Sequence, residues 1–372
     1  MNVIFTCGGT GGHINPAIAV ANMLRERVRD CQILFVGGEG GIECKLVPQA
    51  GYRLETLNPS GLKRKLTPKA IYENVVGVKH TLDSLKKARR IIKEFKPDVI
   101  VGTGGYASFP ILREGAKMGI PTCVHESNAV PGLTTRMVAG KVDQILVCFE
   151  ECGRQYKNPE KVRAVGMPVK SEFIFTRRDE ARRELGLDER PFVVSAFGSL
   201  GARDMNTAMA EFMALEQQAG NPWQHLHATG SFGWKWMPEL VKEKGVRLEN
   251  GLQMREYIYN MPTVMAAADV IISRAGSSSL NEIAASGTPC VILPRPNVVD
   301  NHQEKNAAIL EQRGAALVIH EKDCSGKVLY DAVASLLNDD AARAEMRKAL
   351  LDMAVMDSTE QICNVVQNLA AK

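Results

Sequence analysis

Short apolar runs alternate with helix-like segments along the whole chain, and the alternation occurs twice. In the first half it predicts strands at residues 2–7, 32–36, 98–102, 122–125, 144–148 and 162–165. In the second half it predicts strands at residues 191–196, 225–229, 246–249, 270–273, 290–293 and 316–319. Apolar strands separated by helices are typical of parallel βαβ units. The sequence therefore predicts an α/β protein with two doubly wound parallel sheets in tandem.

A length of 372 residues also favours two domains, because a single hydrophobic core rarely grows to this size. Gly166 and Pro168 interrupt the pattern after the last strand of the first set, which predicts domains of residues 1–165 and 166–344. From Asp339 onward the pattern is helical. In open α/β sheets ligands bind beyond the carboxyl ends of the strands, so we expect the functional residues in the loops that follow strands, around a cleft between the domains.

The chain lacks the features of several other protein classes. No apolar run is long enough to span a membrane, and the N-terminus does not have the pattern of a secretory signal. The nine cysteines lack the spacing of zinc or redox motifs, so we expect reduced thiols in a cytoplasmic protein. The net charge of +4 is too small to indicate a nucleic-acid partner.

Basic residues concentrate between Gly61 and Lys96, where eleven Lys or Arg stand against three acids. Around Leu62–Val78 these cations are mixed with apolar residues, which suits an anionic membrane surface. A solvated helix with a buried apolar stripe has a similar composition. Composition alone favours this second interpretation.

A glycine-rich turn, GGTGGH, follows the first predicted strand. Its glycines would let backbone N–H groups approach a ligand at the positive end of a helix, whereas a purely structural turn needs fewer of them. The spacing matches neither a P-loop nor a dinucleotide fingerprint. His13 ends the turn, where the helix dipole disfavours the charged imidazolium, so His13 is our candidate general base.

Two further loops follow strands of the second half. The segment SRAGSSSLNE offers hydroxyls and N–H groups that suit a diphosphate, although serines at a helix start are also ordinary N-caps. Glu282 would bind a ribose diol, unless it serves only the helix dipole. The segment FGSLGAR opens the second half as the glycine turn opens the first.

Polar residues also follow other predicted strands, in the segments GTGGY, HESN and DNHQ. Their repeated place at strand ends indicates one shared site. No Asp-x-Asp pair occurs, so the sequence predicts no divalent metal on a diphosphate, and no motif calls for a cofactor.

Taken in order, these segments resemble the MurG family of peptidoglycan glycosyltransferases. The resemblance runs from residue 3 to about residue 310 and rests on GGTGGHINPAIAVA, GTGGYASFP, HESNAVPGLTTR, GMPV, FGSLGARDMN, SRAGSSSLNEIAASGTPCVILP and DNHQEKNA. It implies a GT-B fold, with two Rossmann-like domains around a cleft and a C-terminal helix, about residues 345–372, that packs back on the first domain.

The resemblance implies an inverting transfer of GlcNAc from UDP-GlcNAc to the C4 hydroxyl of MurNAc in undecaprenyl-pyrophosphoryl-MurNAc-pentapeptide, lipid I. The products are lipid II and UDP. The family's place is the cytoplasmic side of the cell membrane, as a peripheral protein. Because the implied acceptor is a membrane lipid, we now interpret Leu62–Val78 as a membrane contact rather than as a solvated helix.

Site residues also follow from the resemblance, position by position. His13 matches the family's candidate base, and Glu126 is a rival or supporting acid. Substrate contacts are implied for Thr10, Gly11, Gly12 and Asn128 on the donor sugar nucleotide, Ser199 on the diphosphate, Ile258 on uracil through its backbone, Ser277, Ser278, Ser279, Leu280, Asn281 and Glu282 on phosphate and ribose, and Gln303 on the sugar.

Three residues depart from the family's pattern. Lys170 stands where arginine is usual, which keeps the charge on the diphosphate but loses the two-pronged geometry of a guanidinium. Leu200 replaces a usual glutamine and Phe197 a usual glycine. Both lie in the loop near the leaving group, where they would alter donor affinity or mark a different acceptor.

Three alternatives remain open at this point. Another GT-B transferase, acting on a different lipid or a small aglycone, would share the donor loops, although GTGGY and HESN match the acceptor side of the MurG family. A UDP-GlcNAc 2-epimerase has the same architecture without an acceptor. A nucleotide-binding module without activity is the third.

Overall fold

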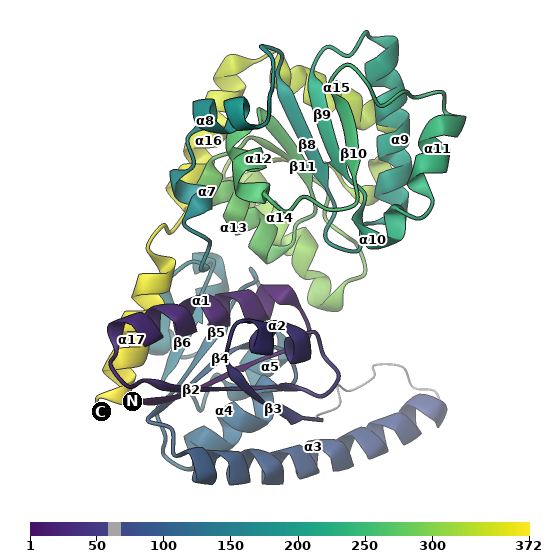
Figure 1. The fold of residues 1–372 in the computed structure, drawn as a ribbon. Helices are drawn as coiled ribbons and strands as arrows, with labels where there is room; N and C mark the ends of the chain where they lie inside the picture. Colours follow the sequence, from purple (N-terminus) through teal and green to yellow (C-terminus); the bar gives the residue numbers. More distant parts are fainter. Residues whose placement is uncertain (59–67) are drawn as a thin grey trace. The chain divides into compact units, whose positions relative to one another are not determined.

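The computed structural model describes residues 1–58 and 68–372, without the side chains of residues 68–76, 78 and 299. The chain forms two compact units (Figure 1). Unit 1 comprises Met1–Val169 together with Asp357–Lys372, and unit 2 comprises Lys170–Met356.

Unit 1 contains a seven-stranded parallel sheet in the order β3-β2-β1-β4-β5-β6-β7. Its strands are β1 (Asn2–Cys7), β2 (Gln32–Gly38), β3 (Arg53–Leu57), β4 (Val99–Gly104), β5 (Thr122–Glu126), β6 (Gln144–Val147) and β7 (Val162–Ala164). Its helices are α1 (Gly11–Arg27), α2 (Glu43–Gln49), α3 (Pro68–Phe95), α4 (Ser108–Lys117), α5 (Leu133–Val138), α6 (Glu150–Gly153), the 3-10 turn η1 (Pro159–Lys161) and the last helix of the chain, α17 (Ser358–Ala370). The order reverses at β1 and β4, which is where such sheets bind ligands.

The core of unit 1 joins residues from both ends of the chain. Phe5 on β1 stacks on Phe35 of β2 with ring centroids 5.3 Å apart. Helices α1 and α17 lie side by side over the same core, to which α17 contributes Ile362 and Val366. Both side chains are buried, and the thiol of Cys363 donates to a backbone oxygen of α1. The end of the chain is therefore part of the core of unit 1 (Figure 1).

Unit 2 contains a six-stranded parallel sheet in the order β10-β9-β8-β11-β12-β13. Its strands are β8 (Phe192–Ala196), β9 (Gln224–Ala228), β10 (Leu252–Arg255), β11 (Val270–Ser273), β12 (Cys290–Ile292) and β13 (Leu317–Val318). Its helices are α7 (Glu172–Phe175), α8 (Arg178–Glu184), α9 (Arg203–Gln218), α10 (Gly230–Gly233), α11 (Met237–Glu243), α12 (Met261–Ala267), α13 (Ser277–Ser286), η2 (Val299–Asn301), α14 (His302–Gln312), η3 (Glu321–Asp323), α15 (Gly326–Leu337) and α16 (Asp340–Met353).

The two parallel α/β sheets confirm the predicted fold class, and three details differ from the prediction. Strand β3 was not predicted, because an edge strand with alternating charged residues has a weak apolar pattern. The strand predicted at 246–249 is wrong: after the left-handed Asn250 and Gly251, pairing begins only at Leu252. The predicted terminal helix of 345–372 is two helices, and only α17 belongs to unit 1.

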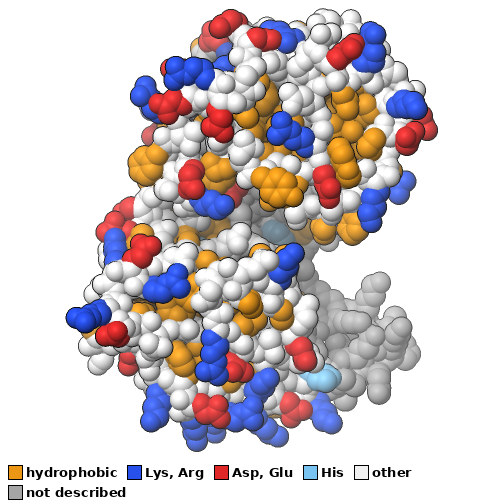
Figure 2. All heavy atoms as spheres, in the orientation of Figure 1, with side chains coloured by type: hydrophobic (Ala, Val, Ile, Leu, Met, Phe, Trp, Pro, Cys, Tyr) orange, Lys and Arg blue, Asp and Glu red, His pale blue; other side chains and the backbone are white. Residues whose placement is uncertain are grey.

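Charged side chains of both signs are interspersed over the face shown in Figure 2. Basic residues gather along the edge of unit 1 formed by the described half of α3, which carries Lys86, Lys87, Arg89, Arg90 and Lys93. Residues 59–67, the start of the predicted membrane segment, lie outside the described residues. Among residues 1–58 and 68–372, no helix has the length and apolarity needed to cross a bilayer.

Candidate active site

The predicted site residues follow the carboxyl ends of neighbouring strands within each unit. In unit 1, His13 follows β1, the GTGGY segment covers the end of β4 and the loop after it, and Asn128 follows β5. In unit 2, Ile258 follows β10, Ser199 follows β8, the serine-rich segment follows β11, and Gln303 follows β12. Each unit thus brings its candidate residues to one edge of its sheet.

His13 lies in the first turn of α1 with a defined tautomer. The helix begins after Thr10, whose backbone is extended, and the Nδ1 atom of His13 lies 2.9 Å from the carbonyl oxygen of Gly8. A carbonyl only accepts hydrogen bonds, so Nδ1 carries the hydrogen in the neutral ring. The Nε2 atom then holds the lone pair that a general base requires.

The end of β4 and the loop that follows it hold His13 in place. The hydroxyl of Thr103 donates to the carbonyl oxygen of His13 at 2.6 Å. A Cβ atom on Gly104 would lie 2.9 Å from Nε2 of His13, and one on Gly105 would lie 2.4 Å from the oxygen of Gly8. Both glycines also have positive φ, 112° and 85°. Only glycine satisfies both requirements, which accounts for the GTGGY segment.

Glu126 is buried and accepts four hydrogen bonds. Its Oε1 accepts from the backbone and side-chain amides of Asn128, at 3.1 and 3.3 Å, and its Oε2 accepts from Gly132 and Thr135, at 2.8 and 2.7 Å. A carboxylate engaged in this way orients its neighbours. The geometry therefore suits Glu126 to holding the Asn128 side chain rather than to taking a proton from a substrate.

The loop after β8 presents Ser199 to solvent. Backbone hydrogen bonds from Ser231 and Phe232 to Ser199 and Leu200 attach the loop to α10. Leu200 is 55% exposed beside Ser199. Phe197 instead is buried, with its ring 6.0 Å from that of His227. Of the two departures in this loop, only Leu200 changes the exposed surface, because Phe197 belongs to the core.

Helix α13 begins directly after the serine-rich turn. Gly276 is its N-cap, and Ser277, Ser278 and Ser279 form the first turn, where N–H groups lack helical partners. The Asn281 amide donates to the oxygen of Ser277 at 2.8 Å. Leu280 is different: its side chain is 2% exposed and its N–H donates to Gly276. The structure therefore places Leu280 in the core and away from the ligand-facing surface.

Glu282 is a carboxyl group with a raised pKa. Desolvation by burial raises its pKa to about 7, while the positive charge of Lys170 acts in the opposite direction. Lys170, the first residue of unit 2, is therefore close enough for its charge to act on Glu282. The site in unit 2 thus contains one exposed cation and one carboxyl group that titrates near neutral pH.

Two other residues have polar groups suited to a ligand. Ile258 is 2% exposed, and in the described part of the chain its backbone N–H and carbonyl make no hydrogen bond. A buried and unpartnered peptide group needs a partner, which a ligand can supply. The Oε1 atom of Gln303 accepts from the N–H of Arg295 at 2.9 Å, and its Nε2 atom takes no part in that hydrogen bond, so its donors are available for a ligand.

The sequence did not indicate a role for Arg274 or Asn306, although both support the serine-rich turn from the core side. Arg274 is buried, pairs with Glu321 at 2.6 Å and donates to the carbonyl oxygen of Leu293. The buried Asn306 amide donates to Ala275 at 3.1 Å. A sequence signal was available only for Arg274, which directly follows the apolar strand β11, because Asn306 is 31 residues from Ala275.

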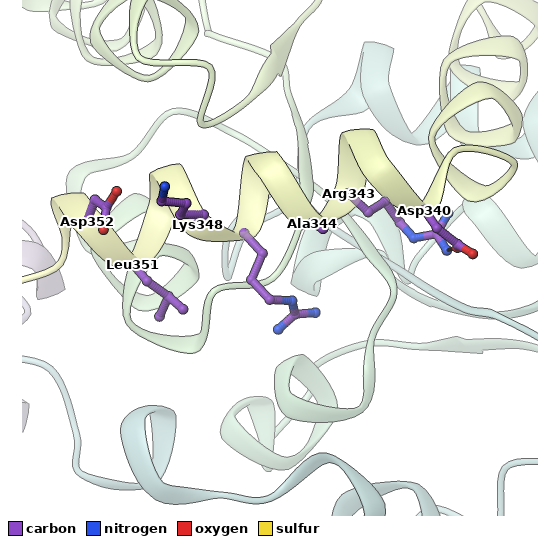
Figure 3. Close-up of a pocket in the computed structure, with 7 residues that line it drawn as sticks. Asp340, Arg343, Ala344, Lys348, Leu351 and Asp352 are labelled. Atoms are coloured by element: carbon purple, nitrogen blue, oxygen red, sulfur yellow. Dashed lines mark hydrogen bonds and ion pairs between the residues drawn. The ribbon is translucent and has the colours of Figure 1, made fainter.

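A groove of about 460 Å³ elsewhere in unit 2 does not contain any of these residues. It runs along α16, where Arg343, Lys348 and Leu351 lie on the same helix (Figure 3). A ligand site normally draws polar groups from several elements, and this groove is lined by one.

Comparison with known proteins gives the family. Residues 3–147 match the N-terminal domain of glycosyltransferase family 28, and residues 192–362 match its C-terminal domain. A UDP-N-acetylglucosamine–N-acetylmuramyl-(pentapeptide) pyrophosphoryl-undecaprenol N-acetylglucosamine transferase of Thermoanaerobacter sp. strain X514 is 40% identical, covering 99% of this chain and all of that protein.

Solved structures agree with this match. MurG of Acinetobacter baumannii is 26% identical with a TM-score of 0.74, covering 99% of each chain. A UDP-GlcNAc 2-epimerase of Neisseria meningitidis, solved with UDP-GlcNAc, is 12% identical with a TM-score of 0.65, covering 99% of this chain and 100% of that one, and shares the fold alone. The chain belongs to the MurG family of N-acetylglucosamine transferases, built from the two domains of glycosyltransferase family 28.

Proposed function

We propose that this chain transfers GlcNAc from UDP-GlcNAc to the C4 hydroxyl of MurNAc in lipid I, with inversion, to give lipid II and UDP. The observation that carries the proposal is the 40% identity, over the full length, to a transferase named for this reaction. The site geometry in each unit supports it, because unit 1 offers a base and unit 2 offers a nucleotide-binding edge.

His13 acts as the general base of the proposed reaction. Its Nε2 takes the proton of the acceptor hydroxyl while that oxygen bonds to C1 of GlcNAc. The bond from C1 to the phosphate oxygen breaks at the same time, and its electron pair leaves with UDP. The transition state resembles an oxocarbenium ion, as in other glycosyl transfers. Thr10, Gly11 and Gly12 present the first turn of α1 to the sugar nucleotide, and Asn128, held by Glu126, binds the sugar.

Unit 2 stabilises the departing UDP. The first turn of α13, with Ser277, Ser278 and Ser279, receives the diphosphate together with Ser199 and Lys170, because N–H groups, hydroxyls and a cation all bind anions. Loss of one such donor costs about 3 kcal/mol in the barrier, or roughly a hundredfold in rate.

The nucleoside and the sugar take the remaining polar groups of unit 2. The unpartnered backbone of Ile258 supplies one donor and one acceptor, which match the donor and acceptor edge of uracil. Glu282 accepts hydrogen bonds from the ribose diol, and the side-chain amide of Gln303 donates to a sugar hydroxyl.

Product analysis with UDP-GlcNAc and a lipid I analogue tests the proposal against its alternatives. Release of UDP that depends on lipid I supports it. Release of UDP only with another lipid or aglycone would assign a different transferase, and formation of UDP-ManNAc would assign an epimerase. Binding without turnover would leave a nucleotide-binding module. Unchanged turnover of His13→Ala would remove His13 as the base.

We also propose that the enzyme works as a peripheral protein on the cytoplasmic side of the membrane, through the basic and apolar segment Leu62–Val78. The acceptor is lipid-linked, and each cation near an anionic surface contributes about 1 kcal/mol. Charge reversal at Lys63, Arg64 and Lys65 should weaken sedimentation with anionic vesicles and leave the affinity for UDP-GlcNAc unchanged. Equal sedimentation of variant and parent would contradict the membrane contact.

A further inference from the structure

The peptide group between Gly8 and Gly9 forms hydrogen bonds through both its carbonyl oxygen and its N–H. The carbonyl oxygen of Gly8 accepts from Nδ1 of His13 at 2.9 Å, and the N–H of Gly9 donates to Oε2 of Glu43 at 3.3 Å. These two atoms belong to the same peptide unit and point in opposite directions. A carboxylate, a peptide and an imidazole therefore form one chain of hydrogen bonds.

Glu43 lies in the first turn of α2, where the helix dipole favours an acid, but it is almost fully buried. Its side chain is 1% exposed, and its other oxygen accepts from the N–H of Gly38 at 2.7 Å. Within residues 1–58 and 68–372 it forms no ion pair. Burial of a carboxylate without a cation is costly, so its charge requires an explanation beyond packing.

The peptide between Glu43 and His13 is fixed by close contacts. A Cβ atom on Gly8 would lie 2.6 Å from Oε1 of Glu43, so glycine is required for the carboxylate to approach. On the other side, the backbone of Gly105 is pressed against the oxygen of Gly8. The hydrogen bonds at the two ends of the peptide and the nearby backbone of Gly105 hold its carbonyl towards the imidazole.

Negative charge at the N–H end of a peptide strengthens its carbonyl as an acceptor, since hydrogen bonds in a chain polarise one another. A stronger acceptor at Gly8 stabilises the Nδ1–H of His13, and more so when Nε2 gains a proton and the ring becomes cationic. In serine hydrolases a carboxylate contacts the histidine directly and serves the same purpose.

We propose that Glu43, acting through the Gly8–Gly9 peptide, is a positioning residue that holds His13 as the Nδ1–H tautomer and favours protonation at Nε2. Its effect on turnover rests on the proposed function of His13, whereas its effect on the imidazole does not.

Two other titratable groups near this chain of hydrogen bonds have shifted pKa values. Burial, with the charge of Glu43, raises the pKa of Cys7 on β1 to about 12. Burial lowers the pKa of His125 on β5, against the raising effects of its hydrogen bond to Gly166 and of the charge of Glu126, and the charge of His13 lowers it slightly more. The effect of Glu43 on His13 is therefore measured as a difference between a Glu43 variant and the parent, in which both of these groups are present.

Selective ¹⁵N labelling of the histidines in the full-length chain tests the proposal. Seven histidines give ring signals, and the signal lost in His13→Gln assigns His13. The native chain should show hydrogen on Nδ1 at high pH, a result that needs no change to Glu43. Hydrogen on Nε2 instead would overturn the proposal.

The variant Glu43→Gln keeps the shape and removes the charge. The ring signals of His13 should then titrate about 1 pH unit lower than in the parent, and the acidic limb of kcat/KM should move with them. Glu114→Gln is the control, because Glu114 is also a buried carboxylate of unit 1 but pairs with Arg89 and Arg113. An unmoved His13 titration in a folded Glu43→Gln contradicts the proposal. If the titration moves while His13→Ala keeps its turnover, the chain of hydrogen bonds stands and the role of His13 as base fails.

Discussion

A Cβ atom on Gly105 would lie 2.4 Å from the carbonyl oxygen of Gly8, on a different loop of unit 1. This contact joins the loop after β4 to the turn after β1 through two stretches of bare backbone. Because the same oxygen accepts from His13, the position of the candidate base depends on how closely the backbone of Gly105 can approach Gly8.

Gly105→Ala should therefore lower kcat at least tenfold, since the methyl group meets backbone that cannot yield. Gly119→Ala is the matched control, because Gly119 has a similar positive φ and open space around it. Thermal unfolding should show a loss of about 1 kcal/mol in both variants from the left-handed backbone, with a further loss in Gly105→Ala. Equal turnover of the two variants would show that the contact does not position His13.

Glu282 should make stability depend on pH. Its pKa in the folded chain is raised to about 7 from an ordinary 4.5, so the folded state holds a proton that the unfolded state releases. The stabilisation is complete below pH 4.5 and is lost as the pH rises to 7, by at most about 3 kcal/mol. Urea unfolding at pH 4.5 and 8 should show a smaller decrease in Glu282→Gln than in the parent. A parallel decrease in both would exclude Glu282 as the cause.

UDP should release a proton when it binds near pH 7. A ribose diol donates to the ionised carboxylate, so binding lowers the pKa of Glu282. Calorimetry in two buffers with different ionisation enthalpies measures this release, which should disappear in Glu282→Gln.

Lys170→Met should weaken UDP binding about tenfold, because one charged contact is lost. Lys170→Arg keeps the charge and should bind UDP as tightly as the parent or more tightly. Equilibrium binding of UDP measures both variants. Unchanged affinity of Lys170→Met would place the diphosphate away from this residue.

The buried ion pair next to the serine-rich turn should contribute more to the free energy of unfolding than an exposed ion pair does. Glu321→Gln leaves the buried guanidinium of Arg274 without its counter-charge, with an expected loss of about 3 kcal/mol in the free energy of unfolding. Asp331→Asn breaks the exposed pair with Lys327 and should cost less than about 1 kcal/mol. Similar losses would mean that Arg274 is solvated in solution.

The fold class and the place of the candidate residues followed from the sequence because buried parallel strands are almost wholly apolar and glycine-rich turns mark their ends. The turn at Gly8–His13 and the helix start at Ser277 needed only local pattern. The contacts between loops did not follow, since the separation of Glu43 from Gly9, or of Arg274 from Glu321, carries no periodic signal.

The sequence misjudged single residues where neighbouring side chains of one motif point in opposite directions, one towards the surface and the next towards the core. Leu280 and Phe197 stand in segments that resemble ligand loops, yet both side chains face the core, and only packing reveals this. No glycine or proline marks the break between α16 and α17, so the sequence predicted one terminal helix.

Helix α17 has a consequence for biosynthesis. Its side chains complete a core whose other members come from the first half of the chain, so the ribosome must translate all of unit 2 before that core can close. During synthesis the strands of unit 1 remain without the packing of α17 while unit 2 is made. A stop codon just before α17 would therefore yield a nascent chain with an apolar face left for chaperones and proteases.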